Sequence, residues 1–238
     1  MFNAISEWFG SIKADFVFNI IDGNRYVMLL NGLKVTILVA LGAALMGVVL
    51  GSIIALMRIS NAHIGKWYFL RSISSIYIDI IRGTPVAVQL MIMYYIILSS
   101  YAGPKEVIAI LSFGLNSAAY VSEMIRAGIL AVDKGQVEAG RSLGLSGGAT
   151  MGLIVAPQAA KVALPSLFNE FITLLKETSV VGFIGLMDLT KAGDYIRSRT
   201  YSAFFPLITV AVIYLIIVIG LTRLFGYIER RMRKSDIR

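Results

Sequence analysis

Apolar residues fill long runs of the chain, and charged or glycine-rich breaks separate these runs. Uncharged runs cover residues 35–57, 83–104 and 201–222. Each is close to the ~20 residues that a helix needs to cross a bilayer. Two further apolar stretches, 106–129 and 162–185, contain a few charged residues. The pattern predicts an all-α integral membrane protein with five transmembrane helices.

The breaks between these runs set the expected spans. We expect the first span at 33–57, where Gly47 and Gly51 form a GxxxG pattern that permits close helix packing. The second, at 70–100, contains Arg-Gly-Thr-Pro at 82–85. Non-helical backbone persists at membrane depth only where protein or a cavity satisfies it, so we expect a long or broken second helix. The fifth span is expected at 202–225.

A less obvious stretch, EAGRSLGLSGGATMGLIVAP, occupies residues 138–157. Residues 142–160 carry no charge, which is nearly enough to span a bilayer. However, glycines, a proline and hydroxyl residues weaken a helix here and raise its insertion cost. A span at this place would also put the basic C-terminal tail on the opposite side of the membrane. The pattern therefore favours a cytoplasmic loop at about 130–160.

Short helices are expected within this loop. Lys134 to Leu143 can form one helix, with Gly144 as its left-handed stop. Ser146 can cap a second short helix that runs to Pro157. Together they predict a compact helix–turn–helix under the membrane.

The N-terminal segment, residues 1–26, is no signal peptide, because charged residues interrupt its apolar positions. Its apolar residues recur at steps of three and four, which is typical of an amphipathic helix lying in the membrane interface. A frayed terminus is an equally good interpretation. The recurring residues are Phe2, Ile5, Phe9, Ile12 and Phe16.

The distribution of lysine and arginine predicts the orientation. A topology with the N-terminus outside and the C-terminus in the cytoplasm places thirteen basic residues inside and seven outside, as the positive-inside rule requires. The inside residues are Arg58, Lys66, Arg71, Arg126, Lys134, Arg141, Lys161, Arg223, Arg230, Arg231, Arg233, Lys234 and Arg238. The outside residues are Lys13, Arg25, Lys34, Lys105, Lys191, Arg197 and Arg199.

Composition excludes several classes of function. A net charge of +8 would indicate nucleic-acid binding in a soluble protein, but here the basic residues mark cytoplasmic loops, anionic lipid and a basic tail at 227–238. The chain has no cysteine and one histidine, His63 in a basic loop, so we expect no disulfide, thiol nucleophile or metal site. No phosphate-binding G-x-x-x-x-G-K-[ST] loop is present, so ATP and its Mg²⁺ must bind elsewhere.

The loop carries a family resemblance. Glu138-Ala139, Gly144, Ile154 and Pro157 have the spacing of the EAA loop of binding-protein-dependent ABC importer permeases. That pattern is Glu-Ala-Ala, three residues, Gly, nine residues, Ile, any residue and Leu-Pro. The chain departs from it at Gly140, where the extra glycine is expected to loosen the loop helix, and has Ala156 in place of leucine.

Other segments resemble the polar amino acid branch of the same family, and the resemblance covers roughly residues 27–226. They occur in the family's order along the chain, which makes the set far more specific than any one motif. The segments are Arg82-Gly83-Thr84-Pro85 with Gln89, Ala119-Tyr120 with Glu123 and Arg126, residues 163–171, and residues 175–179.

This resemblance implies the permease subunit of a type I ABC importer in the bacterial cytoplasmic membrane. The chain would be no enzyme and would bind no cofactor itself. Its implied partners are two ATP-binding subunits, a second permease that is identical or similar, an extracytoplasmic binding protein, lipid and an amino acid substrate. The loop would couple to the ATP-binding subunit through Glu138, Ala139, Gly140, Gly144 and Leu145.

Charged and polar residues in the fourth span are candidates for the substrate pathway. Glu170 is expected near mid-membrane depth, where transporters bind substrate, and can meet an ammonium group. Gln89 or Asn169, with unwound backbone near Thr84, can meet a carboxylate. Thr173 and Lys176 continue the stripe that Asn169 begins. The alternative is that the charged residues of this span form structural ion pairs with one another or with Arg82.

Two other classes of function compete with the importer. An ion-coupled secondary carrier would act alone, but it would be expected to show internal repeats and more spans. A membrane-embedded enzyme would need a nucleophile or metal cluster that the sequence lacks.

Overall fold

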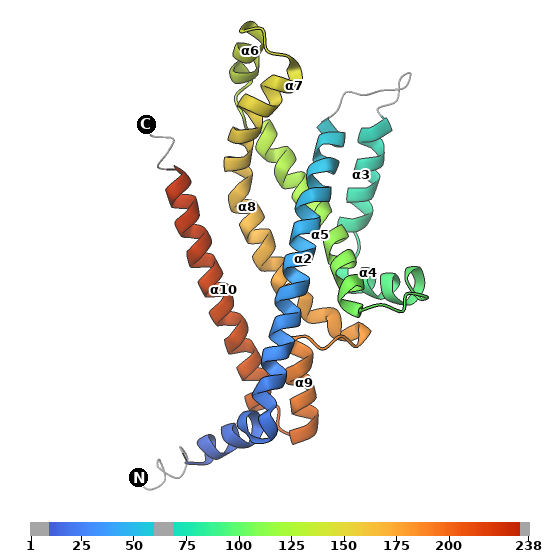
Figure 1. Ribbon diagram of the computed structural model, residues 1–238, viewed down its shortest axis with the longest axis vertical. Helices are drawn as coiled ribbons and strands as arrows, with labels where there is room; N and C mark the ends of the chain where they lie inside the picture. The colour runs from blue at the N-terminus through green and yellow to red at the C-terminus, as the bar shows by residue number, and fades with distance from the viewer. Residues whose placement is uncertain (1–9, 60–68, 234–238) are drawn as a thin grey trace.

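A computed structural model describes residues 10–59 and 69–233, and every regular element in those residues is a helix (Figure 1). Four helices are long and apolar enough to cross a membrane: Gly10–Ile59, Lys105–Leu130, Gly147–Ile184 and Phe204–Met232. A bent pair, Phe69–Arg82 with Val86–Ile97, supplies a fifth crossing if it counts as one broken span. The all-helical prediction and the break in the second span are therefore confirmed.

The first span is longer than expected. Residues 10–16 are helical, a π-turn occupies Val17–Ile21, and α2 runs from Arg25 to Ile59. A 3-10 turn at Asp22–Asn24 lies between them, where Gly23 and Asn24 adopt left-handed backbone conformations. Residues 1–9 of the proposed interfacial segment 1–26, together with His63, lie outside the described residues.

The α2 helix packs along α5, Lys105–Leu130, through small residues. A Cβ atom on Gly47 would lie 2.9 Å from Ser117 Oγ, and one on Gly51 would lie 2.9 Å from the carbonyl oxygen of Ala118. Both glycines of the GxxxG pattern therefore face α5 and let the two backbones approach closely.

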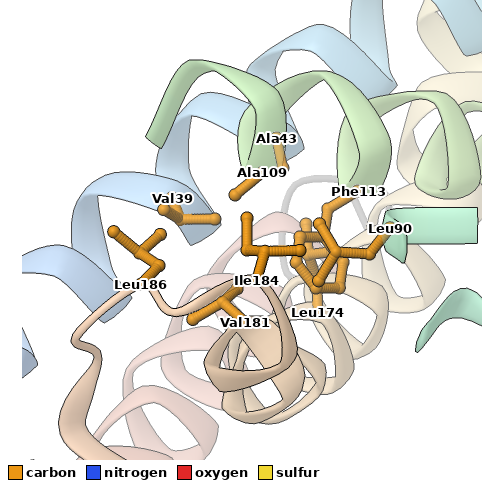
Figure 2. Packing of buried hydrophobic residues seen from close by; sticks show 9 residues of the cluster. All are labelled: Val39, Ala43, Leu90, Ala109, Phe113, Leu174, Val181, Ile184 and Leu186. Atoms are coloured by element: carbon orange, nitrogen blue, oxygen red, sulfur yellow. The ribbon is translucent and has the colours of Figure 1, made fainter. Parts of the chain in front are cut away.

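A buried cluster fills the space between the helices near the end of the chain's fourth apolar segment (Figure 2). It draws side chains from α2, α5, α4 (Val86–Ile92), α8 (Ala156–Glu177) and the 3-10 segment η5 (Thr178–Ile184). The members are Val39, Ala43, Leu90, Ala109, Phe113, Leu174, Val181, Ile184 and Leu186. This cluster fixes the broken second helix against α5 and α8.

The predicted loop forms a projection at one end of the molecule (Figure 1). It comprises α6, Lys134–Ser142, and α7, Gly147–Thr150. The expectation that the second helix ends at Pro157 is wrong. A π-turn at Met151–Val155 joins α7 to α8, and Pro157 lies in the first turn of α8, where its missing N–H breaks no helical hydrogen bond.

A short helix that the hydropathy pattern did not predict, α9, spans Leu189–Thr200 before the last helix, α10, Phe204–Arg233. Asp188 caps α9 by accepting hydrogen bonds from the backbone N–H groups of Thr190 (3.0 Å) and Lys191 (2.9 Å). Asp188 is 0% exposed. The next residue, Leu189, donates its backbone N–H to Thr36 Oγ1 on α2. Burial raises the pKa of the Asp188 carboxyl, so its neutral form is favoured relative to an exposed aspartate.

Replacement of Asp188 should separate its capping role from its charge. Asp188→Ala removes both cap bonds inside a buried site and should lower the unfolding free energy by about 2 kcal/mol. Asp188→Asn keeps a capping oxygen without the charge, so it should lower the unfolding free energy by less than about half as much as Asp188→Ala. Equilibrium unfolding in mixed micelles measures both variants. Equal losses for alanine and asparagine would show that the charge, rather than the cap, stabilises this corner.

Candidate functional site

The projection at residues 133–150 is built by two capped helices around a left-handed turn, and we call it the knob. Asp133 caps α6 by accepting from Gly135 N (2.7 Å), and Ser146 caps α7 by accepting from Ala149 N (3.2 Å). Between them Gly144 adopts φ +83°, which only glycine reaches without strain. The guanidinium of Arg141 donates to the Leu145 carbonyl (2.8 Å) and closes the turn.

Gly140 has a different role from the loosening that its sequence predicts. It is buried, and a Cβ atom there would lie 2.8 Å from Ile154 Cδ1 and 2.9 Å from Thr150 Cγ2. The absent side chain lets α6 lie directly on the helix that continues into α8. The knob is thereby packed closely against the start of this helix.

The remaining predicted coupling residues are accessible. Glu138, Ala139 and Gly144 are exposed, and Leu145 is half-buried. Sequence reasoning missed Leu143, whose side chain at the tip is 82% exposed.

The break in the second span is held together by Gln89. Its amide nitrogen lies 2.8 Å from the Ile81 carbonyl, 3.1 Å from the Thr84 carbonyl and 2.7 Å from Thr84 Oγ1. Its amide oxygen accepts from Asn116 Nδ2 on α5 (2.9 Å). Pro85 and the 104° bend leave these carbonyls without helical partners, and Gln89 supplies the missing donors.

Both ends of the Gln89 side chain are therefore engaged by the protein. That Gln89 also contacts a substrate stays a prediction. In the described structure Gln89 orients Thr84, which is exposed and donates through its hydroxyl to the Ile80 carbonyl (2.9 Å). Asn116, which joins Gln89 to α5, was absent from the predicted site.

The polar stripe on α8 has the predicted arrangement. Asn169, Thr173 and Lys176 are all exposed and lie three or four residues apart, so they share one face of the helix. Ser166 extends this face by one more turn. The stripe makes no packing contact that buries it within this chain.

Glu170 lies on a neighbouring face and points toward α5. Its Oε1 accepts a hydrogen bond from Ser117 Oγ (3.0 Å). A cavity of about 460 Å³ adjoins it, bounded by α2, α5, α8 and α10. Apart from Ser117 and Glu170 its walls are apolar, and they include the stacked rings of Phe168 and Phe225. Glu170 thus borders the stripe without belonging to it.

Glu123 on α5 is the centre of an ion cluster. It accepts from Arg126 (2.8 Å), as the i, i+3 spacing predicts, and it also contacts Arg58 at the end of α2. The structural alternative was that the charged residues of this span form ion pairs. In the described part of the chain neither Glu170 nor Glu177 pairs with Arg82, and Lys176 makes no ion pair with an acid. Among those same residues no three potential metal ligands come together.

A family model matches the chain over residues 47–234, and its description is "Binding-protein-dependent transport system inner membrane component". The chain is 38% identical to the arginine transport system permease protein ArtQ of Bacillus subtilis, over 87% of this chain and 94% of that protein. It is 36% identical to the L-cystine transport system permease protein TcyB of the same organism, with 90% of each covered. A putative glutamine transport system permease protein GlnP of Rickettsia typhi is 36% identical, over 87% of this chain and 94% of that protein.

Solved structures agree with these relatives. A crystal structure of an amino acid ABC transporter with histidines superposes with a TM-score of 0.79 at 40% identity, over 87% of this chain and 94% of that chain. An inward-facing MetNI methionine ABC transporter superposes with a TM-score of 0.75 at 20% identity, covering 88% and 98% of the two chains. At that lower identity the similarity concerns the fold alone.

The link between Gln89 and Asn116 can be measured by a double-mutant cycle. Gln89→Leu leaves two carbonyls of the break without donors and should lower the unfolding free energy by about 2 kcal/mol or more. Asn116→Leu should lower it less, and the coupling energy of the pair should be about 0.5–2 kcal/mol. Gln136→Leu, on the exposed surface of the knob, is the control and should change it by less than about 0.5 kcal/mol. A coupling energy of zero would contradict the proposed support of the break.

Proposed function

The chain belongs to the family of binding-protein-dependent transport system inner membrane components, and on this premise we propose that it lines the path by which a polar amino acid enters the cell. It is a multi-pass subunit of the inner membrane and not an enzyme. Energy comes from ATP, with its Mg²⁺, on separate ATP-binding subunits. An extracytoplasmic binding protein delivers the amino acid, and a second permease, identical or similar, completes the path. The observation that carries this proposal is the knob, whose α6 packs through Gly140 onto Thr150 and onto Ile154 in the π-turn that leads into α8.

The knob supports a coupling role through Glu138, Ala139, Gly140, Gly144 and Leu145. The exposed acid and the exposed Leu143 offer a docking surface, while Gly140 lets α6 pack closely on Thr150 and Ile154, which lead into α8. Closure of the ATP-binding subunits would then push on the knob and move α8 as a rigid helix. No covalent step on this chain is required.

The substrate path through the membrane would lie along α8, at the end away from the knob. We assign the pathway to the face of Asn169, Thr173 and Lys176, because this polar stripe is exposed in the single chain. In a bilayer such a face needs water or protein beside it, which a second permease and a hydrated path supply. Glu170 borders the path and is the proposed partner of the substrate ammonium. Thr84, with its bent backbone, borders it from the second span, where Gln89 holds it.

Charge reversal on the knob should uncouple transport. Glu138→Lys should lower ATP-driven uptake by about tenfold or more, because it places like charge against the docking site. Gln136→Lys is the control: it also places a lysine on α6, two residues away and on another face, with a charge change of one unit instead of two. Uptake and ATP hydrolysis are measured on the reconstituted complex. Normal uptake by a fully assembled Glu138→Lys complex would remove the coupling role.

Glu170→Gln keeps the shape of the side chain and removes its charge. We expect uptake of L-arginine, L-glutamine or L-cystine to fall about tenfold or more, while basal ATP hydrolysis persists. Ser117→Ala removes the hydroxyl donor but leaves the charge, and it should reduce uptake much less. If Glu170 is structural, the complex will instead assemble poorly and both activities will fall together.

The proposed orientation is testable because the chain has no native cysteine. A thiol introduced by Gly147→Cys, where a side chain meets open space, should react only with reagent admitted to the cytoplasm. A thiol from Ser100→Cys, in the exposed turn after the second span, should react from outside. Labelling of position 147 in intact cells by an impermeant reagent would reverse the topology.

A further inference from the structure

A second cavity lies between the end of α3 (Phe69–Arg82), the inner half of α5 and α8, with a volume of about 550 Å³. It is more polar than the cavity beside Glu170, because its walls include Arg82, Tyr120, Glu123, Arg126 and Ser166. It extends along α5 to Ala131, the residue that ends the helix before the knob. Neither the coupling role nor the pathway stripe accounts for its charged residues.

The charges around this cavity do not balance. Glu123 is the only acid among the described residues that line it, and it already contacts both Arg126 and Arg58. Arg82 has no acidic partner in the described part of the chain. Two arginines therefore line the cavity against one acid, which makes it positive, and Arg82 is the arginine without an acidic partner among the described residues.

The position of Arg82 is fixed by Tyr120. The guanidinium carbon lies 5.1 Å from the centroid of the Tyr120 ring, a cation–π contact. Stacking on a ring occupies the face of the guanidinium plane and leaves its N–H edge available for hydrogen bonds. An arginine without a counter-ion is costly inside a membrane protein, and such residues mark ligand or ion pathways.

We propose that Arg82, held over Tyr120, binds the carboxylate of the amino acid as it passes along the path. The planar fork of arginine matches a carboxylate with two parallel hydrogen bonds. Every free amino acid carries this group, so the site would serve the substrate class and not a particular side chain. The proposal rests on the proposed function, since it names a contact within that import path.

The cavity is placed to pass the substrate onward. Ser166 lines it and also begins the exposed polar face of α8 that continues to Asn169 and Thr173. A carboxylate leaving that face therefore meets Arg82 next. From there the cavity leads to Ala131, on the knob side of the membrane.

A charge-selective thiol reaction tests the site without depending on transport. Ser166→Cys places a single thiol in the wall of the cavity, in a complex with no other cysteine on this chain. A negatively charged methanethiosulfonate should react faster than a positively charged one of similar size. Arg82→Gln should lower the ratio of the two rates by about tenfold, because removal of one nearby charge acts on the two reagents in opposite senses. Arg71→Gln, on the same helix but three turns away, should leave it unchanged.

Substrate protection then tests the carboxylate contact. L-arginine, L-glutamine and L-cystine are compared with their carboxamides. A transported amino acid should slow the reaction at position 166, and its carboxamide should not. Arg82→Lys should keep the preference for the negative reagent but weaken this protection, because lysine retains the charge and loses the fork.

The possible outcomes distinguish a failure of the proposed import function from a failure of the proposed Arg82 site. Absence of ATP-driven uptake in the unsubstituted complex would refute the proposed function itself. Normal uptake with equal protection by amino acids and carboxamides would overturn only the Arg82 site. A rate ratio that Arg82→Gln does not change would also overturn it. Loss of assembly in both Arg82→Gln and Arg82→Lys would assign Arg82 to a structural ion pair with another subunit.

Discussion

A lipid bilayer offers no hydrogen-bond partner to the backbone, so each bend of a spanning helix must be satisfied from within the protein. The sharpest bend of this chain, at Gly83–Pro85, depends on that constraint. The Gln89 side chain supplies donors to the Ile81 and Thr84 carbonyls, and Asn116 holds Gln89 from α5. These hydrogen bonds tie the bend to α5, and the exposed residues beside it, such as Thr84, are those that we assign to the substrate path.

The α5 helix is the element to which the other parts attach. Asn116 reaches the bend, Ser117 reaches Glu170 on α8, Tyr120 underlies Arg82, and Glu123 gathers Arg126 and Arg58. The glycines of α2 close the opposite side of α5, where any larger residue would collide. We propose that α5 is the fixed reference against which α8 moves when the knob is displaced. Such a movement would link ATP hydrolysis on a partner subunit to a change in the path.

The amino-acid sequence was sufficient to predict those features that are determined by residues close together along the chain. The spans follow from hydropathy, the knob turn from Gly144, and the Glu123–Arg126 pair from its spacing. The continuation of α7 into α8 did not follow, because proline in a first helical turn and proline after a helix end look alike. The short α9 was missed because a buried aspartate cap carries no hydropathy signal. Contacts across helices, such as Gln89–Asn116 and Arg82–Tyr120, cannot be derived from one-dimensional spacing at all.

The central claim is that this chain moves an amino acid only when a separate subunit hydrolyses ATP. The most direct measurement is uptake of labelled L-arginine, L-glutamine and L-cystine into proteoliposomes without ion gradients. The chain is reconstituted alone, with its ATP-binding subunit, and with that subunit plus the binding protein. The account predicts uptake of at least one of the three amino acids only in the complete system and only with ATP and Mg²⁺ present. Uptake by the chain alone, or uptake that an imposed ion gradient drives without ATP, would contradict it.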